Sequence, residues 1–300
     1  MITDEQIKGL VNGTVDKEGL TKKDWRLISL HRGLPENFVQ KYEDKVEWWQ
    51  ISVYQQLSED FVRRYADRVD WMVLSGSNPM SESFMREFAD WLDWRRICIY
   101  KRLSEDFMRE FADRLDWNNV VRYQALSEGF ILDYADKLGW GDISVYQKLS
   151  EDFIRKYASR MGWREISAYQ TLSERFLREH ADDVDWVLVS GTQHLSEGLI
   201  RDFADKVNWK NISRSQKLSM GFLREFADKV DWRTVSQYQR LTEEAIREFA
   251  DKLDWKKVSR HQRLTEGLIQ DFVDKVHWGL VAIHQRLPEG FIEEAAGQTE

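Results

Sequence analysis

The 300-residue sequence has little of what several protein classes need. Cys98 is the only cysteine, so an intrachain disulfide is excluded and a reducing, cytoplasmic setting is expected. No apolar run approaches the roughly 20 residues of a membrane-spanning helix, so we expect no membrane partner. Residues 1–5 lack the basic and apolar regions of a secretory signal. Only three prolines occur, against fourteen tryptophans.

The charge balance also excludes some functions. Lys and Arg number 44 against 52 Asp and Glu, a net charge of −8. Phosphate binding requires a basic excess, so this balance disfavours a general nucleic-acid coat. A composition of 42% hydrophobic and 32% charged residues is typical of a folded, water-soluble protein.

The tryptophans reveal an internal repeat. Twelve of the fourteen follow one another at intervals of 23 residues without an insertion or deletion, and Trp49 and Trp91 lie outside this series. The series consists of Trp25, Trp48, Trp71, Trp94, Trp117, Trp140, Trp163, Trp186, Trp209, Trp232, Trp255 and Trp278. A large aromatic residue at a fixed place in every repeat is typical of packing, so we expect the tryptophans to form the core.

Each repeat predicts two short helices. Asp231 is a natural N-cap, and Trp232, Val235, Ser236 and Gln239 fall on one face of a helix, which we call helix B. Helix A begins after Ser58 and extends to about residue 69, with acids in its first turn and an apolar face. Helices this short are not stable alone, so neighbouring repeats must bury their faces.

The predicted fold is therefore all-α, an α-solenoid of about twelve helix-turn-helix repeats with terminal caps. Residues 1–24 are expected to form an N-terminal cap in which Thr3 begins a helix. Eleven repeats occupy residues 25–277, and residues 278–300 hold a partial last repeat and a C-terminal cap. Pro35 and Pro288 replace the capping serine in the first and last helix A.

The recurring polar residues are best interpreted as structural. The fourth residue after each tryptophan is usually serine but becomes Cys98, Val121 or Ala282, so small size suggests close packing. An arginine recurs in helix A at Arg63, Arg86, Arg109, Arg155, Arg178, Arg201, Arg224 and Arg247. The trio Glu59, Arg63 and Asp67 falls on one helix face and recurs in most repeats, which predicts a self-neutralised, solvated surface.

Catalytic and metal-binding motifs are not found. His31, His261 and His284 share one repeat position, but stacked helices about 8–10 Å apart hold them too far apart for one zinc ion. No phosphate-binding glycine loop, HExxH motif or Cys/His pair occurs. We therefore expect no enzyme activity, no metal and no cofactor.

Two repeats depart from the pattern in helix B. The third and eighth repeats have an apolar first turn and an internal glycine, which costs roughly 1 kcal/mol relative to alanine. Either the apolar residues form a contact surface, or helix B is more deeply buried in these repeats. With the two tryptophans outside the series, the candidate partner-binding residues are Trp49, Met72, Val73, Gly76, Trp91, Val187, Leu188 and Gly191.

The repeat Trp-x-x-Ile-Ser-x-Tyr-Gln-x-Leu-Ser-Glu-x-Phe, as in Trp140 to Phe153, resembles short tandem repeats of uncharacterised bacterial, phage and giant-virus proteins. The resemblance covers residues 25–296 and implies no established activity. The architecture is similar to that of HEAT, armadillo and tetratricopeptide arrays, whose period of roughly 34–47 residues is longer. That similarity suggests protein binding at the level of fold.

Our leading hypothesis is a non-enzymatic scaffold that binds a protein partner through variable helix B surfaces, with sequestration as one use. The alternative is single-stranded nucleic-acid binding with one repeat per base. Its reader residues would be Tyr54, Ser77, Tyr100, Tyr123, Thr192, Ser215 and His261, and the acidic net charge argues against it. Neither the identity of a partner nor the oligomeric state follows from the sequence.

Overall fold

The computed structural model describes residues 2–16, 18–288 and 291. These residues form 24 α-helices and one short 3-10 helix (Ala158–Arg160), with no strand among them. The predicted all-α solenoid of about twelve repeats is confirmed. The chain divides into two compact halves, Met1–Gln147 and Lys148–Glu300. Most of the predicted C-terminal cap, residues 289–290 and 292–300, lies outside the described residues.

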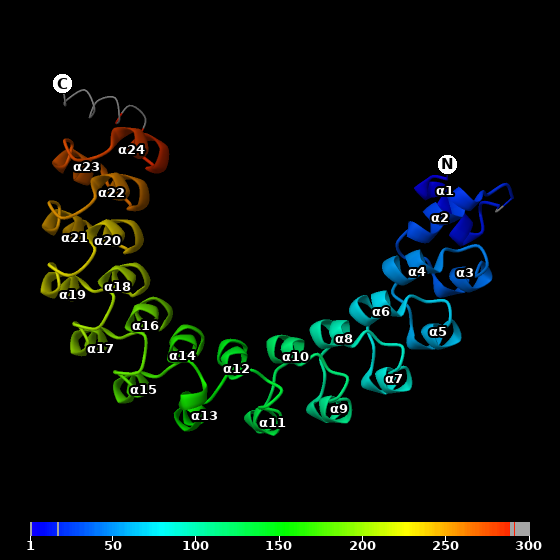
Figure 1. Cartoon of the computed structure of the whole chain (residues 1–300). Coiled ribbons are helices and arrows are strands. Elements are labelled where there is room, and N and C mark those ends of the chain that lie inside the picture. The colour runs from blue at the N-terminus through cyan, green and yellow to red at the C-terminus, as the bar shows by residue number, and fades with distance from the viewer. Residues whose placement is uncertain (1, 17, 289–290, 292–300) are drawn as a thin grey trace. The chain divides into compact units, whose positions relative to one another are not determined.

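The even-numbered helices, which correspond to helix B, pack on one another in chain order within each half (Figure 1). We call them the even row. In the first half they are α2 (Lys22–Leu30), α4 (Trp48–Tyr54), α6 (Trp71–Ser77), α8 (Trp94–Tyr100), α10 (Trp117–Tyr123) and α12 (Trp140–Tyr146). In the second half they are α14 (Trp163–Tyr169), α16 (Trp186–Thr192), α18 (Trp209–Ser215), α20 (Trp232–Tyr238), α22 (Trp255–His261) and α24 (Trp278–His284).

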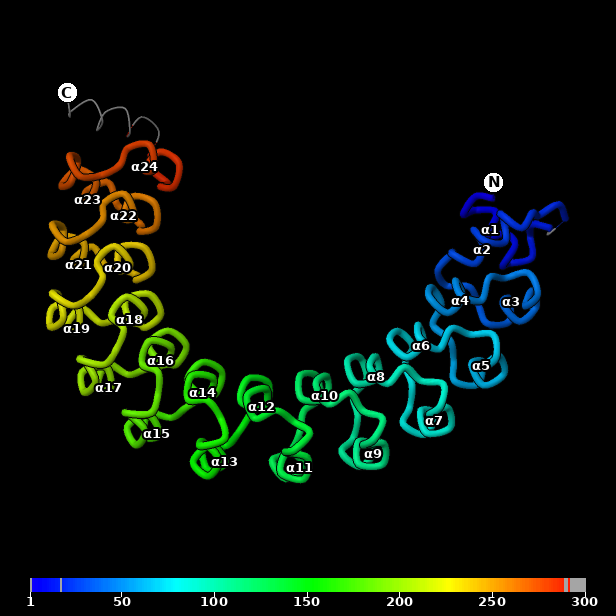
Figure 2. The backbone as a smooth tube through the Cα atoms, in the orientation of Figure 1, coloured from blue at the N-terminus to red at the C-terminus, as the bar shows by residue number. Residues whose placement is uncertain are grey.

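The odd-numbered helices form a second row, the odd row, whose neighbours approach one another less closely than those of the even row. The first half contains α1 (Asp4–Asn12), α3 (Glu36–Lys41), α5 (Glu59–Arg64), α7 (Glu82–Glu87), α9 (Glu105–Glu110) and α11 (Glu128–Asp133). The second half contains α13 (Glu151–Tyr157), α15 (Glu174–Glu179), α17 (Glu197–Asp202), α19 (Met220–Glu225), α21 (Glu243–Glu248) and α23 (Glu266–Asp271). Within each half the backbone curves toward the even row (Figure 2).

Side-chain caps explain where these short helices begin. The Asp231 carboxylate accepts the Thr234 N–H at 2.7 Å at the start of α20, and Ser58 Oγ accepts the Phe61 N–H at 3.2 Å at the start of α5. Thr3 forms a capping box with Gln6, as expected for the N-terminal cap. Pro35, in the serine position, provides no side-chain cap to α3. None of the described helices has the length and apolar composition needed to cross a bilayer.

The odd-row helices are shorter than predicted. Helix α5 ends at Arg64, and the chain continues through a turn to Val69 instead of remaining helical. The turn leaves the Ala66 carbonyl oxygen free, and the indole N–H of Trp71 donates to it at 2.8 Å. The same bond joins Trp94 to Ala89 at 3.0 Å. The tryptophan therefore closes the turn that ends the preceding helix.

The core is centred on a different position from the predicted one. Trp25, Trp71 and Trp186 are buried, whereas the other nine tryptophans of the series are half-buried at its edge. The third residue after each tryptophan is fully buried in all twelve repeats, because it faces inward from the middle of the even-row helix. These residues are Ile28, Ile51, Leu74, Ile97, Val120, Ile143, Ile166, Val189, Ile212, Val235, Val258 and Val281.

The recurring serine does more than provide a small side chain. Ser213 is fully buried, and its hydroxyl donates to the Trp209 carbonyl at 2.7 Å while accepting the Asp231 N–H of the next repeat at 3.0 Å. Ser190 bonds Trp186 and the Asn208 N–H in the same way. Each serine thus links one even-row helix to the cap of the next.

A glutamine ladder also joins the repeats, and sequence reasoning missed it. Gln216, seven residues after Trp209, is 3% exposed. Its Nε2 donates to the carbonyls of Ser190 at 3.1 Å and Gln193 at 2.8 Å, and its Oε1 accepts the Leu195 N–H at 3.0 Å. The near-constant glutamine at this position was the available signal. The ladder fixes the backbone on which the variable surface residues stand.

Candidate functional site

The exposed part of the even row begins directly after each tryptophan. Met72 and Trp49 occupy this position on α6 and α4, which pack against each other, and their side chains are 57% and 55% exposed. In the third repeat Met72 is therefore exposed, whereas Trp71 beside it is buried more deeply than most tryptophans of the series. Two large apolar side chains therefore stand on neighbouring helices with their surfaces open to solvent.

Trp91, in the turn after α7, is a third exposed apolar residue of these repeats. Its indole lies 5.7 Å from that of Trp71, centre to centre, and it remains 51% exposed. In most other repeats this position holds Lys or Arg, and in several the cation lies over the tryptophan ring, as with Arg68 at 5.8 Å from Trp48. Arg68 also pairs with Asp44 at 3.4 Å, a pair that tryptophan cannot form. Trp91 thus replaces a charged bridge between repeats with exposed aromatic surface.

The two glycines have a packing explanation. A Cβ atom on Gly76 would lie 3.3 Å from Arg96 Nη1 and 3.4 Å from a Tyr100 ring carbon. A Cβ atom on Gly191 would lie 3.4 Å from Asn211 Nδ2, which donates to the Val187 carbonyl at 2.8 Å. Both glycines therefore admit a side chain of the following repeat.

The eighth repeat does not match the third on its surface. Val187 is 52% exposed, but the equivalent residues on the neighbouring helices are Arg164 and Lys210. Val73 and Leu188 are half-buried in their respective helices. We call Trp49 on α4, Met72 on α6 and Trp91 in the turn after α7 the apolar patch, because all three are more than half exposed. Val187 has no such apolar neighbour at the equivalent positions of the adjoining helices.

An open hollow adjoins the apolar patch. It has a volume of about 460 Å³ and is lined by Trp49 with Lys22, Lys23, Arg26, Glu47 and Gln50. None of its three cations has an ion pair within the described part of the chain. Gln50 is 3% exposed, and its Oε1 has no hydrogen-bond partner. The hollow thus combines an indole with positive charge and an unsatisfied buried acceptor.

Carboxylates neutralise the arginines of the odd row, as predicted, but the predicted pairing with the Asp67 position is wrong. Arg63 pairs with Glu59 at 3.8 Å, but its closest carboxylates are Asp60 at 2.8 Å and Glu87 of the next repeat at 2.7 Å, and Asp67 is not a partner. The turn after α5 takes Asp67 off the helix face.

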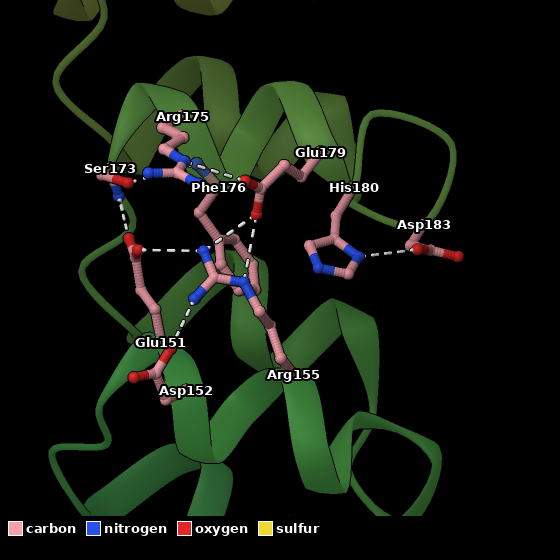
Figure 3. A network of polar contacts seen from close by, with 9 residues as sticks. All are labelled: Glu151, Asp152, Arg155, Ser173, Arg175, Phe176, Glu179, His180 and Asp183. Carbon is pink, nitrogen blue, oxygen red and sulfur yellow. Dashed lines mark hydrogen bonds and ion pairs between the residues drawn. The ribbon is translucent and has the colours of Figure 1, made fainter.

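Figure 3 shows this arrangement in another repeat. Arg155 lies between Asp152 at 2.8 Å and Glu179 of the next repeat at 2.9 Å, and its guanidinium lies 5.1 Å from the Phe176 ring centre. Hydrogen bonding to Glu179 raises the pKa of Arg155. The arginines therefore join neighbouring repeats, and they are already paired with carboxylates of the same chain.

The residues considered as nucleic-acid readers vary in exposure. Tyr100 and Tyr123 are 62% and 57% exposed, whereas Tyr54 is half-buried. The Thr192 hydroxyl donates to the Leu188 and Ser167 carbonyls. The His261 residue is exposed overall. Partial desolvation of its ring, followed by repulsion from Arg260, Lys257 and His284, lowers its pKa. The tyrosines thus present open rings at one repeat position.

Among the described residues, no three His, Cys, Asp or Glu side chains are grouped so that they could hold a metal ion. Cys98 is fully buried, and this burial raises the pKa of its thiol to about 11. Comparisons of the chain with protein-family models, curated proteins and solved structures gave no match.

Proposed function

We propose that the protein is a non-enzymatic scaffold that binds a protein partner through the apolar patch. The observation that carries this proposal is that Trp49, Met72 and Trp91, in two consecutive repeats, are each more than half exposed. Exposed apolar surface grouped in this way marks contact sites, whereas single exposed apolar residues need no explanation. Tryptophan in particular is enriched among residues that dominate binding energy.

The adjoining hollow indicates the chemistry of the partner. Lys22, Lys23 and Arg26 supply positive charge beside the Trp49 indole, with Glu47 as the one acid in the lining. A complementary segment would carry apolar side chains for the patch and carboxylates for the hollow. Its backbone or side-chain N–H groups could satisfy the Gln50 oxygen, which lacks a donor. The partner surface we propose is therefore apolar with an acidic edge.

The absence of catalysis is part of the proposal and rests on how the reactive groups are used. The recurring serines are fully buried, and their hydroxyls bond backbone groups, as Ser75 does with the Trp71 carbonyl at 2.6 Å. The raised thiol pKa of Cys98 disfavours the thiolate, which is the nucleophilic form. These groups are engaged in holding repeats together.

Met72→Asp tests the proposal, with Val187→Asp as a matched control. Both residues are exposed and both take the position after the tryptophan, where an acid suits the helix dipole. We expect both variants to keep the helical circular dichroism spectrum of the wild-type protein. Wild-type and Val187→Asp baits should retain the same protein from the native cells, and the Met72→Asp bait should lose it, as quantified by mass spectrometry.

The retained protein should then be purified and its binding measured by calorimetry. Removal of an aromatic anchor at the centre of an interface typically costs 2 kcal/mol or more, so Trp49→Ala should weaken binding by at least about 30-fold. If the purified protein binds wild-type and Met72→Asp equally, the apolar patch is not the contact surface and the proposal is wrong.

A further inference from the structure

The even row of the second half carries a one-sided charge. Four segments, residues 209–217, 232–240, 255–263 and 278–286, contain ten Lys and Arg and no Asp or Glu. Each segment runs from a tryptophan through the even-row helix to the connection that follows it. We call these cations and the rings among them the basic face. Its cations are Lys210, Arg214, Lys217, Arg233, Arg240, Lys256, Lys257, Arg260, Arg263 and Arg286.

These cations are almost all unpaired. Arg233 lies 3.7 Å from Asp254, and the other nine form no ion pair with any described residue. The N-cap carboxylates of this row, Asp231 and Asp254, accept the Thr234 and Lys257 N–H groups at 2.7 and 3.1 Å. All ten side chains except Lys257 belong to exposed residues. Positive charge is therefore available to a ligand along four consecutive repeats.

A hollow of about 470 Å³ lies at the C-terminal end of this face. The described residues that line it are Arg260, His261, Gln262, Arg263, Leu264, His284, Gln285 and Arg286, and none of these is an acid. The side-chain amides of Gln262 and Gln285 donate to backbone carbonyls of the preceding repeats as part of the glutamine ladder. The backbone that carries the cations is therefore held in place. Arginine guanidinium groups in such a cluster are suited to bind phosphate oxygens through paired N–H groups.

Aromatic rings alternate with the cations. Tyr238, His261 and His284 occupy one position in successive repeats, and all three are exposed. The Arg214 guanidinium lies over the Tyr238 ring, 5.1 Å from its centre, so a cation and an exposed ring are already in contact. A positively charged surface with exposed rings at intervals is the arrangement by which proteins bind single strands, since bases stack on rings while cations follow the backbone.

We propose that the basic face binds single-stranded nucleic acid, independently of the apolar patch. The cations neutralise phosphates, and the rings of Tyr238, His261 and His284 stack on bases. The acidic net charge does not oppose this binding, because the acids belong largely to the odd row and its turns, and charges farther than about 10 Å are screened at 0.1 M salt. An acidic protein segment would use the cations but has no use for the exposed rings.

Fluorescence anisotropy tests the proposal with a labelled oligonucleotide of about 12 nucleotides, within the roughly 4–16 that single-strand binding domains cover. Binding should weaken linearly in log affinity against log salt between about 50 and 200 mM. Arg260→Glu combined with Arg263→Glu should weaken binding at least tenfold and make the salt slope shallower by about 1.4, which is the share of two phosphate contacts. The absence of wild-type binding at about 50 mM salt would overturn the proposal.

Lys229→Glu is the matched control, because this exposed lysine belongs to the turn after α19 and not to any of the four even-row segments. Lys229→Glu, which reverses one charge, should change the affinity for the oligonucleotide less than about twofold. An equal loss would show that net charge alone drives binding and would contradict a specific face. All variants are compared by circular dichroism, and Arg260→Gln provides a milder version should the double reversal unfold the second half.

Tyr238→Ala separates strand binding from simple charge attraction. Loss of one stacking platform should weaken oligonucleotide binding about fivefold or more without changing the salt slope. A labelled polyglutamate peptide of similar length is the competing ligand, and we expect it to bind more weakly than the oligonucleotide. Tighter binding of the peptide, insensitive to Tyr238→Ala, would assign the face to an acidic protein instead. Met72→Asp should leave oligonucleotide binding unchanged, so failure here is distinguishable from failure of the scaffold proposal.

Discussion

The two rows of helices carry charge in opposite ways. In the odd row, Arg201 lies 3.6 Å from Glu197 of its own helix and 2.8 Å from Glu225 of the next repeat. In the even row of the second half, Arg260 and Arg263 have no carboxylate partner among the described residues. The first arrangement joins neighbouring repeats. The second leaves charge free for a ligand.

The net charge of −8 conceals this difference. The segments from each tryptophan to the eighth residue after it contain 19 of the 44 Lys and Arg but only 2 of the 52 Asp and Glu. The acids are concentrated in the odd-row helices and their turns. In a repeat protein, therefore, charge has to be counted by repeat position before it can exclude a class of ligand.

The exposed residues of the even row can vary because the buried glutamine ladder, and not these residues, holds the even-row helices together. Of the variants considered, Gln216→Ala should lower the free energy of unfolding most, because it removes one glutamine of the ladder. The change leaves the Leu195 N–H and the carbonyls of Ser190 and Gln193 without their partner, and buried groups left unpaired cost about 1–3 kcal/mol each. We expect a loss of about 2–4 kcal/mol in the free energy of unfolding, measured by urea denaturation.

Lys217→Ala, one residue later, is the control. Lys217 is exposed and unpaired within the described chain, so its removal should change stability by less than about 0.5 kcal/mol. If both variants lost a similar amount of unfolding free energy, the ladder would not be what holds the even-row helices together.

Much of the fold could be predicted from the sequence, because the 23-residue period and the capping residues are local signals. Asp231 and Ser58 begin helices as their chemistry indicates. The early end of the odd-row helices could not be predicted, since it depends on the bond from the Trp71 indole to the Ala66 carbonyl. The sequence also could not show that Leu74 is more deeply buried than Trp71.

The candidate site was only partly visible in the sequence. Met72, Trp49 and Trp91 were identified from departures in the pattern, but the role of Gly76 and Gly191 required the position of the next repeat. The basic face was missed because arginine was followed only along the odd row. A count of acids in each even-row segment would have found it. Pairing between repeats, as between Arg63 and Glu87, depends on how helices stack.

A smaller effect would sharpen the comparison of the rows. Arg201→Leu imitates Leu132, which takes this repeat position naturally, and it removes two ion pairs and a guanidinium 5.3 Å from the Phe222 ring centre. Exposed ion pairs contribute little, so we expect a loss of up to about 1 kcal/mol in unfolding free energy at low salt, shrinking as salt rises. Arg260→Leu should not destabilise the protein, because it removes no pair. Equal losses for both variants in urea denaturation would contradict the contrast.

The smallest effect concerns the pKa of His261. Burial lowers this pKa first, and repulsion from Arg260, Lys257 and His284 lowers it further from its ordinary value of 6.5, with Arg263 and Arg286 lining the same hollow. The folded state therefore binds its proton less readily than the unfolded state. The stability contributed by His261 is full above pH 6.5 and is lost as the pH falls through its folded-state pKa.

Titration of the imidazole by NMR measures this effect directly. Arg260→Gln should move the pKa of His261 back toward its ordinary value, whereas Arg201→Leu, on the odd row, should leave it in place. Addition of the oligonucleotide should raise this pKa above that of the free protein, because phosphates would offset the surrounding cations. Strand binding should then strengthen as the pH falls. An unchanged His261 titration in the saturated complex would mean that the strand does not reach this part of the basic face.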